Sequence, residues 1–331
     1  MTSQAAIIAA PARPAPWRVA RDLLVLTKPR ITLSSTLAAA AGLAAQGPGG
    51  FRASSLLALV GVSLTVAAAC TFNMWLERDT DALMERTSAR PLPAQRLEAR
   101  AALGQALLLS LAGLAMVMIA GSVAAAGLSL AALLLYSFAY TPLKRITPAA
   151  SLVGVIPGAM PPLIGAALSG TPSMLAWTLS VLLVLWQIPH LMAVALRLRD
   201  QYAVARLHTL LDWLGEARTR VLLRAGFAVL VPAALLPLLA GINHGSLWVG
   251  SAFSSLIALC GLVRSLTDGP SGFRTRWYVL ATVLYVVPLI VGAIHAGLPG
   301  RLPPGQSEGK TATAVDAVHR DCETEQRVAR M

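Results

Sequence analysis

Apolar residues fill most of the chain in long blocks, and short polar segments separate these blocks. A window of about 19 residues, the usual length for detecting membrane helices, finds nine of them. They lie at 31–46, 54–76, 102–119, 122–138, 149–168, 173–196, 222–240, 246–263 and 276–297. Because a bilayer crossing needs ~20 apolar residues, the shorter blocks predict tilted helices that extend past their strictly apolar part. The pattern predicts an all-α fold, a polytopic membrane helix bundle of about nine transmembrane helices.

The composition excludes a soluble protein. Of the 331 residues, 56% are hydrophobic and 13% are charged, and the mean hydropathy is +0.66. Ordinary globular chains carry about 25% charged residues. The three cysteines, Cys70, Cys260 and Cys322, lack the paired spacing of a zinc or redox motif. An integral membrane protein, with the lipid bilayer around it, is the class that fits this balance.

The formal net charge of +12 first suggests a nucleic-acid partner, but the basic residues lie at the ends of the predicted helices. They fall in alternate connections, and before the C-terminal tail only Arg52 lies in the other set. An excess of Lys and Arg marks the cytoplasmic side of a bilayer. We therefore expect no nucleic acid, a cytoplasmic N-terminus, both long polar connections (77–101 and 197–221) in the cytoplasm, and a C-terminus outside.

The two ends of the chain differ from the apolar blocks. Residues 1–25 are expected to form a cytoplasmic arm, because prolines interrupt their apolar run and no basic residue precedes it, unlike a secretory signal. Residues 298–331 contain too few large apolar residues for a core, which predicts a disordered tail. The transmembrane domain is then 26–297. Its long polar connections each follow an even-numbered span, a spacing that suggests two related halves, as in transporters.

Acidic residues are concentrated where the second predicted span reaches the cytoplasm. Four of them fall within 77–85, and no helix breaker occurs before Pro91. If the helix continues, one of its faces carries a polar residue at every fourth position: Asn73, Glu77, Asp81 and Glu85. Like charges at this spacing repel by about 0.2–0.5 kcal/mol per pair, so a cation is expected to offset them.

Oxygen ligands without His or Cys suit Mg²⁺, which binds one or two carboxylates and completes its shell with water and substrate phosphate. The nearby Arg78, Arg86 and Arg90 have the forked geometry that holds phosphate oxygens. A solvated helix extension with mixed charges explains the same spacing equally well. Both interpretations stay open on spacing alone.

Three other segments place polar or helix-breaking residues near the predicted membrane. Lys144 and Arg145 end the fourth span, where they would neutralise phosphate or simply mark topology. The fifth span is interrupted by Gly and Pro between 154 and 165, which membrane depth tolerates only beside protein or a cavity. In the sixth, Gln187 and His190 favour a functional site for a haem or a substrate carboxylate, or else an interhelical hydrogen bond.

Five ordered segments resemble the UbiA superfamily of intramembrane prenyltransferases. The first signature is Asn73-x-x-x-Glu77-x-x-x-Asp81, followed by Met84-x-Arg86-Thr87-x-x-Arg90-Pro91-Leu92-Pro93. The others are Leu26 to Thr32, Tyr140 to Arg145, Gly158 to Gly165 and Trp186 to His190. The residues of these segments are similar to those of the protoheme IX farnesyltransferase branch, and the resemblance spans about 26–297.

The resemblance implies a nine-helix bundle in the plasma (inner) membrane with a cavity open to the cytoplasm. It implies transfer of a farnesyl group from farnesyl diphosphate to a vinyl group of haem B, assisted by Mg²⁺, for a terminal oxidase. Metal ligands would be Asn73, Glu77, Asp81 and Asp200; catalytic residues Asn73, Glu77, Asp81 and Lys144; diphosphate ligands Arg86, Arg90, Lys144 and Arg145; and the haem or acceptor pocket Trp186, Gln187, His190 and Tyr202.

The branch has a second acidic signature, which usually reads Asp-Tyr-x-x-Ala-Gly-x-Pro. This chain departs from it. Gln201, Arg206 and His208 replace its Asp, Gly and Pro, and Asp200 lies one residue early. That displacement turns a helical side chain by about 100°, so Asp200 serves the metal only if the loop adjusts. Glu77 also stands where the branch often has Asp.

Two alternatives therefore remain. One is another UbiA-type enzyme that acts on an aromatic acid or quinone precursor, and the other is a secondary transporter. A transporter does not readily explain the acids and arginines packed between Asn73 and Arg90. A homo-oligomer and oxidase-assembly partners also stay open.

Overall fold

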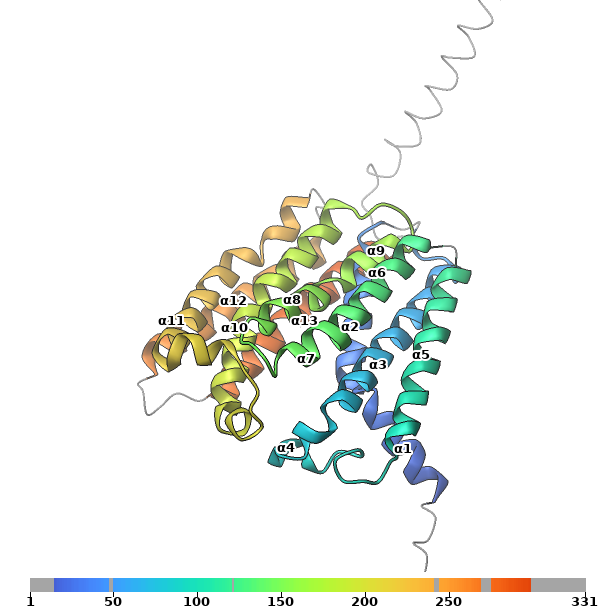
Figure 1. Ribbon diagram of the computed structural model, residues 1–331. Coiled ribbons are helices and arrows are strands. Elements are labelled where there is room, and N and C mark those ends of the chain that lie inside the picture. The colour runs from blue at the N-terminus through green and yellow to red at the C-terminus, as the bar shows by residue number, and fades with distance from the viewer. Residues whose placement is uncertain (1–14, 48–49, 121, 241–243, 269–274, 299–331) are drawn as a thin grey trace, which may run out of the picture.

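The computed structural model describes residues 15–47, 50–120, 122–240, 244–268 and 275–298, and the predicted disordered tail lies almost wholly outside them (Figure 1). These residues form helices and contain no strand. The all-α prediction is therefore confirmed.

Each of the nine predicted spans corresponds to one helix or to a broken helix. In chain order the elements are α1 (Pro16–Leu26), α2 (Pro29–Ala44), α3 (Ala53–Asp81), α4 (Glu85–Ser88), α5 (Ala99–Ile119), α6 (Val123–Leu134), the π-helical turn η2 (Leu135–Tyr140), α7 (Thr141–Leu143), α8 (Ala150–Ala159), α9 (Pro161–Ala167), α10 (Met174–Val204), α11 (Leu210–Ala233), the 3-10 turn η3 (Leu236–Ala240), α12 (Gly245–Thr267) and α13 (Thr275–Gly297). Among the described residues, eight helical stretches are long and apolar enough to cross a membrane. The ninth, α2, has 16 residues.

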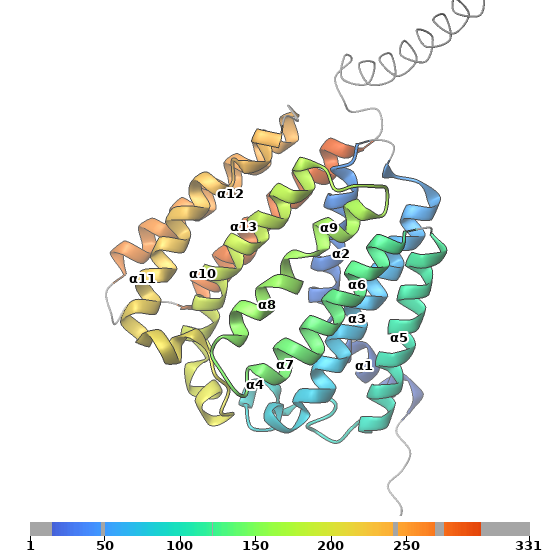
Figure 2. The same cartoon turned by 45° about the horizontal axis from the view of Figure 1, so that its top comes forward.

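The bundle carries apolar side chains on its outside. Leu108 and Leu111 of α5 are 67% and 70% exposed, and Trp177, Leu239 and Val291 on other helices are similarly uncovered. The helices pack mainly as neighbouring pairs, α3 with α5, α12 with α13, α10 with α11 and α2 with α9 (Figure 2). Hydrocarbon is the solvent that such an outer surface requires, so the chain is a multi-pass integral membrane protein.

Close backbone contact joins α2 to the broken fifth span. A Cβ atom added to Gly165 would lie 1.7 Å from the carbonyl oxygen of Ala39, and one added to Gly42 would lie 1.8 Å from that of Pro162. Small residues permit this approach, which is a common way to pack membrane helices. The fifth span itself breaks at Met160, between α8 and α9, within its Gly- and Pro-rich stretch.

Polar segments gather at one end of the bundle (Figure 1), where α1, α4, the end of α3 and the α10–α11 connection lie. Met84, which follows α3, is buried against Ala205 and Leu207 at the end of α10. The two long polar connections, distant in sequence, therefore meet.

One local prediction at this end is wrong. The helix does not continue to Pro91: α3 ends at Asp81, and Glu85 begins the separate α4 and is exposed. The Thr87 hydroxyl donates a hydrogen bond to the Asp81 carbonyl at 2.8 Å, which satisfies an oxygen left free at the helix end. Glu85 is consequently not part of the stripe formed by Asn73, Glu77 and Asp81.

Candidate active site

The last turns of α3 bury three polar side chains in a row. Asn73, Glu77 and Asp81 are 2%, 5% and 1% exposed. Their spacing of four places them on one face of the helix, turned toward the bundle. By contrast, the side chain of Asp79 is 74% exposed. Burial of this stripe argues against the solvated-surface interpretation, because unpaired charges are expensive to remove from water.

Each residue of the stripe has its own basic partner. Lys28 donates a hydrogen bond to the side-chain oxygen of Asn73, and Lys144 forms an ion pair with Glu77. The guanidinium of Arg90 lies 2.6 Å from the Asp81 carboxylate. Three cations thus face two carboxylates and one amide, so the site carries an excess of positive charge.

Lys28 was not predicted as a site residue, although it lies in the segment Leu26 to Thr32 that resembles the family. It joins α1 to α2 in a left-handed backbone conformation (φ 47°), directly before Pro29. Such a conformation costs a non-glycine residue of order 1–3 kcal/mol and persists only where its surroundings impose it. The sequence does show a basic residue directly before a proline that starts a helix. It does not show that this residue contacts Asn73, because Asn73 is 45 positions away.

The two lysines respond differently to burial. Burial lowers the pKa of Lys28 below its usual value, and the more distant Glu77 does not fully offset that effect. Burial also lowers the pKa of Lys144, but the adjacent Glu77 carboxylate, with Tyr140 and Tyr202, more than offsets it, so that the pKa of Lys144 is raised. Lys144 is therefore held firmly in its charged form.

The π-helical turn η2 positions the partners of the stripe. Thr141 follows the turn, accepts a hydrogen bond from Asn73 Nδ2 at 2.9 Å, and donates one to the Tyr136 carbonyl at 2.8 Å. π turns are rare and are frequent at functional sites. Arg145, predicted to bind diphosphate, donates to the Leu76 carbonyl at 2.6 Å, and Arg86 is exposed at the start of α4.

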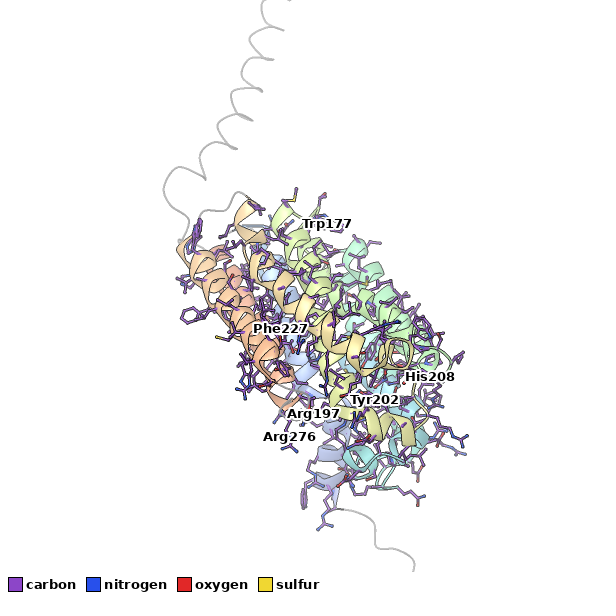
Figure 3. The ribbon with its side chains drawn as sticks, turned by 90° about the vertical axis from the view of Figure 1, so that its left-hand side faces the viewer. Trp177, Arg197, Tyr202, His208, Phe227 and Arg276 are labelled. Carbon is purple, nitrogen blue, oxygen red and sulfur yellow. The ribbon has the colours of Figure 1, made fainter. Side chains whose placement is uncertain are left out.

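The second polar connection borders this site through Tyr202. A small cavity of about 60 Å³ lies beside Lys144 and is also lined by Tyr140, Tyr202 and His208. Tyr202 and His208 lie near each other at the polar end (Figure 3). The backbone N–H of His208 donates to the Lys144 carbonyl at 2.8 Å. These contacts join the second polar connection to Glu77 through Lys144.

Asp200 is not brought to the stripe. Its side chain is 91% exposed and pairs only loosely with Arg199, at 3.4 Å. The next residue differs: the buried Gln201 Oε1 has no hydrogen-bond partner among the described residues. The helix of α10 continues through both positions without adjusting. The position that carries Asp in the resembling branch is thus the more buried one.

Arg206 also shows why the branch prefers glycine there. It lies just past α10 with φ 53°. The N–H of Arg206 donates to the Ala203 carbonyl at 3.1 Å, and that of Leu207 donates to the Tyr202 carbonyl at 2.9 Å. This is the Schellman pattern, in which the left-handed residue is usually glycine.

The residues predicted for the haem or acceptor pocket lie on two sides of α10. Trp186 donates to the Thr282 carbonyl, His190 lies 3.0 Å from the Thr282 hydroxyl, and their rings stack at 5.0 Å. Gln187 instead donates to the Val155 carbonyl at 3.2 Å. Trp186 and His190 therefore face α13 and Gln187 faces α8. Tyr202 lies elsewhere, beside Lys144.

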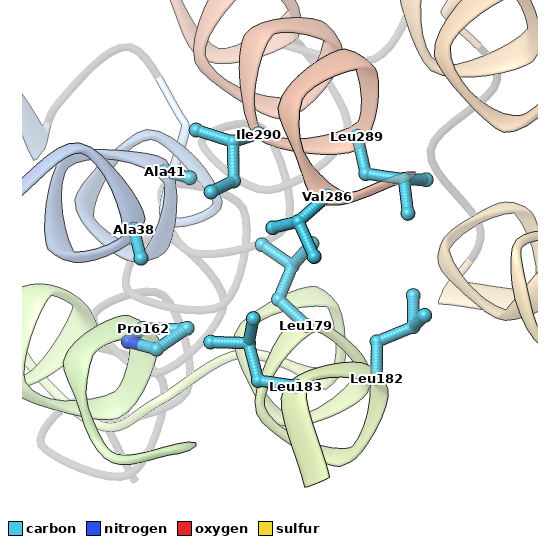
Figure 4. A pocket seen from close by; sticks show the side chains of 9 residues that line it. All are labelled: Ala38, Ala41, Pro162, Leu179, Leu182, Leu183, Val286, Leu289 and Ile290. Carbon is cyan, nitrogen blue, oxygen red and sulfur yellow. The ribbon is translucent and has the colours of Figure 1, made fainter. Parts of the chain in front are cut away.

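An apolar cavity of about 20 Å³ lies deeper in the bundle, between α2, α9, α10 and α13 (Figure 4). Its lining consists of aliphatic and proline side chains: Ala38, Ala41, Pro162, Leu179, Leu182, Leu183, Val286, Leu289 and Ile290. A hydrocarbon chain, and not a polar group, suits such a lining.

The stripe fits Mg²⁺ in the kind of donor it offers. Its side chains provide only oxygen ligands from consecutive helical turns, which is the chemistry of a hard cation. In the described part of the chain, no three His, Cys, Asp or Glu side chains gather closely enough to hold a metal by themselves. Water and a substrate phosphate would therefore supply the rest of the shell.

Comparison with known proteins agrees with this class of membrane protein. The UbiA prenyltransferase family model matches residues 32–270. Curated proteins named protoheme IX farnesyltransferase are 37% identical over 86% of this chain and 97% of the relative in Anaeromyxobacter sp. (strain Fw109-5), and 37% identical over 83% and 88% in Synechococcus elongatus.

Solved structures share the fold. A UbiA homolog from Archaeoglobus fulgidus bound to GPP and Mg²⁺ has a TM-score of 0.64 at 18% identity, covering 83% of this chain and 99% of that one. The apo UbiA homolog from Aeropyrum pernix K1 has a TM-score of 0.66 at 19% identity, covering 80% and 97%. The fold and the buried site define a membrane-embedded enzyme of the prenyltransferase class. The chain belongs to the UbiA prenyltransferase family.

Proposed function

We propose that this chain transfers the farnesyl group of farnesyl diphosphate to a vinyl group of haem B and so makes haem O for a terminal oxidase. The relatives named protoheme IX farnesyltransferase support this choice of substrates. One structural observation carries the proposal: a buried stripe of oxygen ligands with three dedicated cations, at the polar end of an apolar bundle.

The reaction begins when the bond between the farnesyl carbon and the diphosphate oxygen breaks. Mg²⁺, when bound by Asn73, Glu77 and Asp81, supplies a Lewis acid for the negative charge that develops on the leaving group. Lys28, Lys144 and Arg90 lie against the same three side chains and stabilise that charge as fixed cations. A preorganised arrangement of this kind acts more strongly in a dry site than in water.

The allylic cation left behind then forms a carbon–carbon bond with the haem vinyl group, and water adds to the resulting cation with loss of a proton. Early entry of water would destroy the farnesyl cation, so the site must be dry at that stage. The cavity between α2 and α13 has the apolar lining that a prenyl chain requires, but at about 20 Å³ it must widen to hold one. We assign Trp186, Gln187, His190 and Tyr202 to the acceptor side of the site.

The membrane orientation is part of the same proposal. We place the chain in the plasma (inner) membrane, with the N-terminus and both long polar connections in the cytoplasm and the C-terminus outside. The alternating distribution of Lys and Arg supports this orientation. Water-soluble diphosphate substrates would then reach the stripe from the cytoplasm.

The test is extraction of haem from membranes of cells with and without this protein, followed by mass spectrometry. We expect the mass of a hydroxyfarnesyl adduct of haem B only when the protein is present. An unchanged haem B pool, together with prenylation of an added aromatic acid, would replace haem as the acceptor. Absence of Mg²⁺-dependent binding of prenyl diphosphate would reject both enzymes and favour a transporter.

A further inference from the structure

The first helix, α1, has a covered face and an uncovered face. Its covered face includes Asp22 and Leu26, which are 3% and 0% exposed. Its uncovered face carries large apolar side chains: Trp17 is 61%, Leu24 59% and Val25 37% exposed. At about 100° per residue, the exposed positions occupy a single arc of the helix. These apolar side chains therefore share one outer face of α1 with two exposed arginines, Arg18 and Arg21.

The position of α1 along the bundle shows what surrounds that patch. Gln105, in the second turn of α5, donates a hydrogen bond to the Leu23 carbonyl at 3.0 Å. Leu26 packs in a cluster with Met74 and Ala102. The helix thus lies beside the first turns of α5, and the exposed Leu107 and Leu108 follow directly beyond them on α5. This level is the boundary between the polar end and the lipid-facing surface.

Two arginines complete the outer face of α1. The guanidinium groups of Arg18 and Arg21 lie 5.3 Å and 5.9 Å from the centre of the Trp17 ring, and the Arg21 side chain is 59% exposed. Tryptophan prefers the headgroup level of a bilayer, and arginine there binds lipid phosphates while its stem stays in apolar surroundings. Basic and apolar residues on one helix are typical of helices that lie on anionic membranes.

We propose that the outer face of α1 lies on the bilayer surface and binds anionic phospholipid headgroups through Arg18 and Arg21. The occupant is the bilayer because α2 enters the membrane three residues after α1 ends. The charge fits as well, since the only acid of α1, Asp22, turns inward to Arg96 at 3.0 Å. This lipid-binding proposal does not rest on the proposed prenyl transfer.

The covered face connects this lipid contact to the active site. Asp22 accepts two hydrogen bonds from Arg96, at 3.0 and 3.3 Å, and Arg96 also donates to the Ala89 carbonyl at 3.0 Å. The next residue, Arg90, is the partner of Asp81. Thus the helix that contacts lipid also fixes the loop that supplies one of the three cations.

The test measures the surroundings of α1 in the full chain, reconstituted in vesicles of phosphatidylcholine with 0 to about 30% phosphatidylglycerol. A nitroxide is attached at Leu24→Cys after removal of the exposed Cys260 and of Cys322, while the buried Cys70 is retained. Leu108→Cys is the lipid-facing reference, and Asp79→Cys is the aqueous one. Collision rates with oxygen and with a water-soluble nickel complex report the depth of each label.

We expect the label at 24 to collide more with oxygen than with nickel, as at 108, and to move deeper as phosphatidylglycerol is added. The double variant Arg18→Gln, Arg21→Gln should show little of that shift over the same lipid range, because each arginine changes partitioning to an anionic surface roughly five-fold, whereas the exposed Arg197→Gln should match the parent. A nickel-dominated signal, an immobile label reached by neither reagent because protein covers it, or a depth independent of anionic lipid and of both arginines would each overturn the proposal.

Discussion

Lys144 joins the two polar connections of the protein to each other. Its ammonium group pairs with Glu77 at the end of α3, and its carbonyl accepts the N–H of His208 at 2.8 Å from the loop before α11. The side chains of Lys144 and Glu77 are only 17% and 7% exposed. Loss of either partner therefore leaves the other charge buried without compensation.

This pair can be tested with a double-mutant cycle. Lys144→Met should lower the free energy of unfolding by about 3 kcal/mol, the scale for removing one partner of a buried ion pair. Adding Glu77→Gln removes the stranded charge, so the double variant should recover most of the melting temperature in detergent. Its prenyl transfer should stay at least ~10²-fold below the parent, because a preorganised cation is still missing. Recovery of turnover together with stability would show that the pair is purely structural.

Asp81→Asn tests the metal-binding role of the stripe. The substitution keeps the size of the side chain but removes the charge, so Mg²⁺-dependent turnover should fall on the order of 10²-fold. The matched control is Asp79→Asn, because Asp79 lies two residues away on the same helix with its side chain 74% exposed. Steady-state turnover of both purified variants, with thermal melts alongside, is the measurement. Equal turnover in the two would end the metal assignment.

The altered second signature gives a third prediction. Asp200 is exposed and forms only a loose ion pair with Arg199 among the described residues, so Asp200→Asn should leave turnover and the Mg²⁺ requirement within about two-fold of the parent. Gln201→Asp places a carboxylate where the side-chain oxygen of Gln201 is buried, and should lower the Mg²⁺ concentration needed for half-maximal turnover. A strong loss in Asp200→Asn would instead mean that this loop rearranges around the bound substrate.

Arg206→Gly should stabilise the protein. A left-handed backbone costs a residue with a Cβ atom roughly 1–2 kcal/mol, and glycine avoids that cost but loses more chain entropy on folding. The net gain should be about 1 kcal/mol, visible as a higher melting temperature, while Arg206→Ala should give none of it. If alanine stabilises as much as glycine, the arginine side chain, and not its backbone, is the unfavourable element.

Gly165→Ala and Gly104→Ala form a matched pair for the packing of α2 on α9. A Cβ atom at Gly165 meets the Ala39 carbonyl oxygen at 1.7 Å, whereas one at Gly104, on α5, meets nothing within 4 Å. We expect Gly165→Ala to destabilise by about 1–3 kcal/mol, as overpacking does. Gly104→Ala should be neutral or stabilising by up to ~1 kcal/mol, because alanine favours helix. Thermal melts compare the two, and equal effects would contradict the contact.

The fold was predictable because lipid imposes a simple pattern. Every predicted span corresponds to a helix, since a chain in hydrocarbon must satisfy its backbone hydrogen bonds within the helix. The Gly and Pro residues predicted an interruption of the fifth span between 154 and 165, and the structure places it at Met160. The end of α3 was not, because no local breaker follows Asp81. The chain leaves the helix there as Met84 becomes buried against Ala205 and Leu207, a contact that no local pattern encodes.

Only part of the active site was predictable from the sequence. Spacing alone places Asn73, Glu77 and Asp81 on one face, and the structure buries all three. Their basic partners come from other parts of the chain. Lys28 is 45 residues from Asn73, and nothing local indicates which cation pairs with which acid. Arg145 illustrates the limit, because it lies beside Lys144 in sequence yet binds a backbone carbonyl.

The π-helical turn η2 has a consequence for the orientation of the residues that follow it. A π turn holds one more residue than an α turn, and Thr141 and Lys144 follow it directly. If the same residues wound as an α-helix, the extra residue would rotate all that follows by about 100°, whereas the π turn takes up that residue locally. Thr141 would then turn away from Asn73, and Lys144 from Glu77. The direction in which Thr141 and Lys144 point therefore depends on one wide turn of the backbone, and so does the active site.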